Sequence, residues 1–140
     1  MKSFAIRDAE SSIELVLSIA AGAPVPNVGD VDVTARVSSF GFGGSCTCTV
    51  FAAELTAFLL AVQALASSGS GSASLFSMSP GELTLTLEPA NGRGYLLASG
   101  SVGRHVVAEN GVVWHSTTFG FTVEPQQVLD TACAVLRSGA

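Results

Sequence analysis

Alternation of apolar and polar residues at every second position constrains the fold of this 140-residue chain more than any other feature. The clearest example is the segment 82–88, in which Leu83, Leu85 and Leu87 are separated by threonine and followed by glutamate. Successive side chains of a strand point to opposite faces of a sheet. The pattern therefore predicts strands with one buried and one exposed face.

Short turn-forming sequences separate the alternating segments. Strands are predicted over 12–20, 30–40, 45–50, 73–78, 82–88, 94–102, 103–109 and 112–123. Between them lie a Pro/Gly loop over 21–29, the break Gly41–Gly44 and the turn signals Asn91-Gly92 and Asn110-Gly111. Because strands follow strands directly, we expect a mostly antiparallel, strongly twisted β-sheet of about seven to nine strands.

Two segments change to a period of three and four residues. Apolar residues from Phe51 to Ala66 predict one amphipathic α-helix over 51–66. A second helix is predicted over 125–138, because Pro125 suits a first helical turn and an apolar stripe follows it. The expected fold class is α+β, with the sheet packed against two α-helices. The length is typical of one domain, so 1–140 is predicted to be a single α+β domain.

Charge is scarce in this chain. Charged residues make up 12%, with 6 Lys+Arg against 11 Asp+Glu and a net charge of −5. Nucleic-acid surfaces need clustered basic groups, so no nucleic-acid partner is expected. The longest uncharged stretch, Leu55–Gly81, is interrupted by a Ser/Gly run, so its apolar part falls short of the ~20 residues of a membrane span. We expect no membrane partner and a cytoplasmic location.

No catalytic, metal or cofactor site is predicted. Cys46 and Cys48 share a strand face at a spacing that would strain a disulfide, so the thiols are expected to serve as small apolar groups. A two-residue Asn110-Gly111 turn would place His105 and His115 on opposite faces, which disfavours a metal site. The chain also lacks the known phosphate-loop and nucleophile-elbow motifs.

The remaining candidates are acidic and aromatic side chains at strand ends. They are either solvated strand ends or a docking surface for a basic partner. Trp114, close to a predicted hairpin tip, is either a core residue or an exposed interface anchor. The candidate partner-binding residues are Asp30, Asp32, Glu82, Glu88, Glu109 and Trp114.

Several segments of the sequence are similar to those of a known family. They are ELTAFLLAVQAL (54–65), GSASLFSMSPGELTLTLEP (71–89), GRGYLLASGSVG (92–103) and TFGFTVEPQQVLDTACAVL (118–136). Together they resemble the WapI-like immunity proteins of bacterial polymorphic toxin systems, and still more a related uncharacterised family of small bacterial proteins. The WapI-like pattern carries an Asp-Gln pair at the entry to the last helix, where this chain has Glu124-Pro125-Gln126-Gln127. That departure favours the related family.

The resemblance implies a protein that blocks a toxin. It implies no catalytic residues for this chain. The expected function is thus a non-catalytic protein-binding module, an immunity protein neutralising a cognate protein toxin. Two alternatives stay open. One is a self-associating structural domain that forms a homodimer, because so few charges leave apolar surface to cover. The other is a small-ligand-binding protein with a pocket between sheet and helices.

Overall fold

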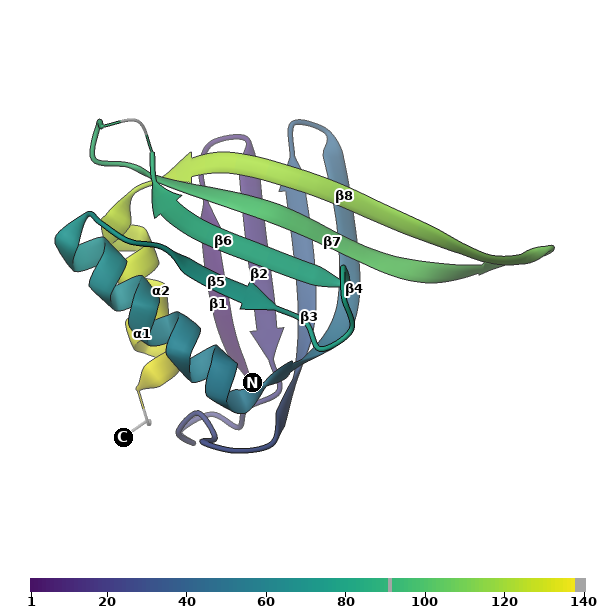
Figure 1. Ribbon diagram of the computed structural model, residues 1–140, viewed down its shortest axis with the longest axis horizontal. Helices are drawn as coiled ribbons and strands as arrows, with labels where there is room; N and C mark the ends of the chain where they lie inside the picture. Colours follow the sequence, from purple (N-terminus) through teal and green to yellow (C-terminus); the bar gives the residue numbers. More distant parts are fainter. Residues whose placement is uncertain (91, 138–140) are drawn as a thin grey trace.

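The computed structural model describes residues 1–90 and 92–137, which fold into eight strands and two helices (Figure 1). The elements are β1 (Lys2–Arg7), β2 (Ser11–Leu17), β3 (Asp30–Ser39), β4 (Phe42–Phe51), α1 (Ala52–Ser68), β5 (Ala73–Phe76), β6 (Leu83–Pro89), β7 (Leu96–Ala108), β8 (Gly111–Val123) and α2 (Pro125–Leu136). The pairing between strands is antiparallel throughout the described residues. The predicted α+β class and strand number are confirmed.

The strands form two sheets where the sequence predicted one. The first sheet has the order β1-β2-β3-β4 and the second the order β5-β6-β7-β8. In each sheet a strand pairs with its neighbour in sequence, and a helix follows the fourth strand. Alternation specifies which face of a strand is buried but not which sheet the strand joins, so the division was invisible in the pattern. The described chain thus uses one order of elements twice.

The two sheets enclose a common core. Figure 1 shows their strands running in crossing directions, with both helices at one side. The inward residues of β3 and β6 are buried, and so is the apolar stripe of α1 from Leu55 to Leu65. The helices pack against each other, α2 also against β1 and α1 also against β5. Hydrophobic burial on these faces holds the sheets and helices together.

The bounds of several elements differ from the predictions. Helix α1 begins and ends one to two residues later than 51–66, and Gly69 closes it in the left-handed conformation with φ of 72°. The end predicted at 138 for the second helix lies outside the described residues, as does Asn91 of one predicted turn. Strand β1 was not predicted. The predicted strands 94–102 and 103–109 form one continuous strand, β7.

The break predicted at Gly41–Gly44 is wrong from its second residue onward, because β4 already begins at Phe42. A Cβ on Gly44 would lie 3.1 Å from Oγ1 of Thr117 in β8, so glycine here allows the two sheets to approach closely. The glycines therefore reflect packing between sheets rather than the end of a strand.

The register of the last hairpin also differs from the prediction. Ala108 pairs with Gly111, so Glu109-Asn110 forms the two-residue turn in place of Asn110-Gly111. The observed register places Phe119 and Phe121 opposite small residues, Gly100 and Ala98, which leave room for the rings. Core packing at the far end of the hairpin thus outweighs the local preference of Asn-Gly for the turn.

Candidate functional site

The most distinctive surface feature is a two-stranded arm. Strand β6 pairs with β7 only as far as Leu83 with Val102, whereas β7 and β8 continue together to Ala108 and Gly111. We call residues 103–116 the arm. In Figure 1 it extends well beyond the rest of the molecule. Beyond its root, β7 has no strand beside it other than β8 in the described chain.

An aromatic pair occupies the outer face at the root of the arm. The Trp114 ring lies over Gly103, at which a Cβ would collide with it, and also contacts the position of Gly81. The His105 ring packs edge-on against Trp114, with ring centroids 4.9 Å apart. Trp114 is thus anchored on two glycines yet still 41% exposed. It offers a rigid, partly open aromatic surface.

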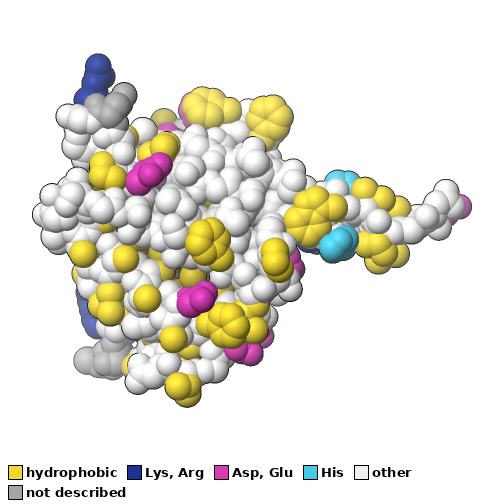
Figure 2. Space-filling view, in the orientation of Figure 1, with side chains coloured by type: hydrophobic (Ala, Val, Ile, Leu, Met, Phe, Trp, Pro, Cys, Tyr) yellow, Lys and Arg dark blue, Asp and Glu magenta, His cyan; other side chains and the backbone are white. Residues whose placement is uncertain are grey.

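The rest of the arm is apolar and exposed. Val107 is 85% and Val112 61% exposed, and Val113 is also exposed. Figure 2 shows hydrophobic and histidine side chains along the arm. Exposed β-branched residues on a free two-stranded ribbon are a typical surface for contact with another protein. The arm therefore exposes apolar side chains that no described part of the chain covers.

A groove lies under the arm, between its root and the end of the β3–β4 hairpin. Its volume is about 600 Å³, and its lining includes Arg36, Arg104 and His115. Oγ1 of Thr117 donates a hydrogen bond of 3.0 Å to the Gly43 carbonyl, which ties the two sheets together beside it. This groove is the place that the ligand-binding alternative would use.

The predicted acidic residues do not come together. Asp30 and Asp32 are exposed on β3, where Asp32 accepts a hydrogen bond of 3.1 Å from Oγ1 of Thr49. Glu82 precedes β6 near the root of the arm, Glu88 lies near the other end of β6, and Glu109 is in the turn at the tip of the arm. These positions lie on β3, at the two ends of β6 and at the tip of the arm, so they form no single acidic patch.

Trp114 is the one predicted residue that belongs to the arm's aromatic pair. The sequence pattern did not single out His105, Val107, Val112 and Val113 as surface residues. A signal for them existed, because the predicted strands 94–102 and 103–109 follow each other directly and together are much longer than 82–88, which pairs only with the first of them. A long hairpin beside a short strand must extend past it.

The two buried cysteines lie close to Glu82. Cys46 donates from Sγ to the Glu82 carbonyl at 2.9 Å, and Cys48 is its neighbour on the inner face of β4. The adjacent Cys46 thiol and burial raise the pKa of Cys48 well above its ordinary value. Cys48 therefore stays protonated at neutral pH, in keeping with a packing role.

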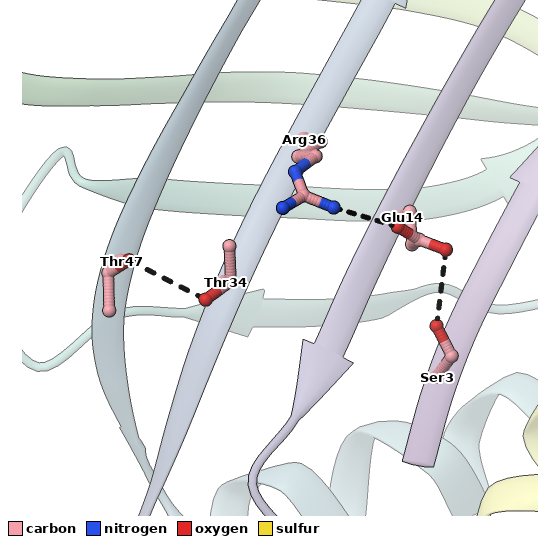
Figure 3. A network of polar contacts seen from close by, with 5 residues as sticks. All are labelled: Ser3, Glu14, Thr34, Arg36 and Thr47. Carbon is pink, nitrogen blue, oxygen red and sulfur yellow. Dashed lines mark hydrogen bonds and ion pairs between the residues drawn. The ribbon is translucent and has the colours of Figure 1, made fainter. Parts of the chain in front are cut away.

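The outer face of the first sheet is polar and hydroxyl-rich. Figure 3 shows the pair between Arg36 and Glu14, with 3.6 Å between Nη1 and Oε1, and a 3.4 Å hydrogen bond from Ser3 to Glu14. Thr34 and Thr47 contact each other across β3 and β4. These groups are exposed or half-buried on the outer face, so each contact contributes little to stability.

Within residues 1–90 and 92–137, no group of three or more His, Cys, Asp or Glu side chains could hold a metal ion. Among the described helices, none has the length and apolar character needed to cross a membrane. No protein-family model, no curated protein and no solved structure matches the chain.

Proposed function

We propose that this chain is a non-catalytic protein-binding module whose arm is the contact surface for its partner. The observation that supports the proposal is the projecting β7–β8 ribbon with exposed Val107, Val112 and Trp114. Burial of an aromatic anchor surrounded by aliphatic side chains is a common source of binding energy in interfaces. The arm adds no buried side chain beyond Gly103, so it contributes little to the core.

The sequence resemblance to WapI-like immunity proteins suggests the class of partner. Such a partner is a protein toxin, and the module would neutralise it by binding rather than by chemistry. An arm that projects from a compact body suits this task, because it can enter a concave site and exclude the toxin's substrate.

The test uses a toxin domain encoded beside this chain's gene, expressed as purified protein. Binding is measured by calorimetry, and protection by growth of cells that produce the toxin. Changing Val107→Asp together with Val112→Asp should weaken binding at least ~10-fold and abolish protection. The physical reason is that burial of each valine side chain in the interface contributes about 1–2 kcal/mol, which aspartate cannot supply.

The matched control is Val28→Asp, which changes an exposed valine in the loop between β2 and β3. It should bind and protect like the unaltered protein. Circular dichroism of all three proteins checks that the fold is retained. Full binding and protection by the folded double variant would refute the arm as the contact surface.

A further inference from the structure

The outer edge of the first sheet at β1 is covered by α2. The Ala5 N–H donates to Oγ1 of Thr131 at 3.1 Å, and the Arg7 N–H donates to Oε1 of Gln127 at 2.6 Å. The Gln127 amide in turn donates to the Arg7 carbonyl at 2.9 Å. Side chains of the helix therefore satisfy the backbone groups that a further strand would otherwise pair with.

Two more sheet edges are also covered. The β4 edge receives a hydrogen bond of 2.8 Å from the Met78 N–H to the Thr49 carbonyl, supplied by the β5–β6 connection. Helix α1 packs along β5 at the edge of the second sheet. Natural proteins protect strand edges in such ways against pairing with another chain. Strand β8 forms the remaining edge.

The backbone groups of β8 that face outward follow from the register. The Gly103 N–H donates to the Glu82 carbonyl, on the β6 side. In this part of β7 the backbone N–H and C=O groups of the odd-numbered residues therefore point away from β8. The backbone groups of the even-numbered residues of β7 thus form the hydrogen bonds to β8. Their partners on β8 are odd-numbered, as in the pair Ala108 with Gly111. The even-numbered residues of β8 from Val112 to Thr122 accordingly point their N–H and C=O groups away from the sheet.

These outward groups have no backbone partner in the described part of the chain. The strand is 13 residues long and contains neither proline nor lysine. Its edge is thus long and lacks the common devices that block strand addition. Of the outermost strands β1, β4, β5 and β8, only β8 lacks a covering element in the described part of the chain, and the free edge of β7 in the arm is much shorter, at residues 103–108.

We propose that β8 pairs antiparallel with β8 of a second copy of this chain, across a two-fold axis near Thr117. The strand holds no Asp, Glu, Lys or Arg from Gly111 to Val123, so self-pairing sets no like charges opposite each other. An axis at Thr117 places Trp114 opposite Gly120 of the second copy. The indole lies over Gly103 of its own β7 and so away from the free edge, and Gly120 has no side chain that could obstruct the second copy.

This pairing joins the second sheet of one copy to the second sheet of the other, so that they form one continuous sheet. It also lays each arm along the body of the other copy. The symmetric contact closes on itself, so it ends at a dimer. It uses the edge of β8, whereas the proposed function uses the faces of the arm. The inference therefore does not rest on the proposed function.

The test is sedimentation of the purified chain and of two variants at Thr118. Thr118→Pro removes one outward N–H and no bond to β7, whereas Thr118→Ala keeps that N–H. The unaltered chain and Thr118→Ala should sediment at twice the chain mass of 14.2 kDa at ~50 μM. Thr118→Pro should shift the dissociation constant upward at least ~10-fold.

A third variant guards against misfolding of the proline variant. Thr118→Lys places two ammonium groups near the axis, so its dimer should weaken at low salt and recover at ~1 M NaCl. Sedimentation of the unaltered chain as a monomer at ~100 μM would overturn the inference. The inference would also be overturned if both variants, Thr118→Pro and Thr118→Lys, fold and form the dimer as tightly as the unaltered chain. Toxin binding by the arm in either case would leave the proposed function standing.

Discussion

At the scale of single residues, Gly103 and Trp114 determine the shape of the arm's root. The indole occupies the space that a side chain at position 103 would need, and His105 packs against its edge. This arrangement holds a large aromatic ring on the surface in one orientation. A glycine beside an aromatic residue on neighbouring strands is a recurring device for placing a ring over the backbone.

Gly103→Ala should therefore destabilise the protein by about 1–2 kcal/mol, because the Trp114 ring must leave its position. Urea unfolding measures the loss, and tryptophan fluorescence reports the displaced ring. In a Trp114→Ala background the same substitution should cost much less, since the colliding ring is gone. The control is Gly120→Ala, which adds a methyl group where the described structure has open space. Equal losses in both backgrounds would contradict this account.

At the scale of elements, helix α2 acts as the cover of an edge strand. Gln127 bonds both backbone groups of Arg7, as the next strand of a sheet would. The sequence resemblance drew attention to this stretch, Glu124–Gln127, only as a departure from a family pattern. The structure shows a local role for Gln127 in closing the first sheet.

Gln127→Ala should lower the free energy of unfolding by about 1 kcal/mol, because water must replace its two exposed hydrogen bonds to the Arg7 backbone. Gln126→Ala is the matched control. Gln126 lies one position away on α2, and its amide bonds only the exposed Asp130 at 2.7 Å. Thermal and urea unfolding should separate the two variants. If both variants lose the same free energy of unfolding, the loss in Gln127→Ala does not come from uncovering the β1 edge.

At the scale of the whole molecule, the low charge content has a structural counterpart. Ser and Thr occupy much of the outer face of the first sheet, and the described residues hold one ion pair, Arg36 with Glu14. Arg36 is largely exposed and Glu14 is half-buried. The fold is thus held by apolar burial and backbone hydrogen bonds far more than by charge.

The free energy of unfolding should consequently change by less than ~1 kcal/mol between 0.05 and 0.5 M NaCl, because screening acts on few charge pairs. Urea unfolding at a fixed protein concentration measures this directly. Fixing the concentration separates salt effects on folding from those on self-association. A change of several kcal/mol would show that electrostatic interactions contribute more than the single exposed ion pair implies.

Local pattern alone determined much of this protein. Alternation in 82–88 and 30–40 and the three-to-four spacing in 51–66 predicted the strands, the helices and the α+β class, because each pattern reports which face of one element is buried. Trp114 was singled out by its position near a hairpin tip. These features depend on neighbours a few residues apart, which a sequence displays directly.

Only the tertiary structure decided how the elements combine. The division into two sheets, the two-residue shift of the β7–β8 register and the covering of β1 by Gln127 depend on contacts between distant segments. The arm is a further case, since it exists because β6 ends where β7 and β8 continue. Such contacts are set by volume and backbone geometry across the core. Alternation carries no information about those quantities, because it records only which face of each strand is apolar.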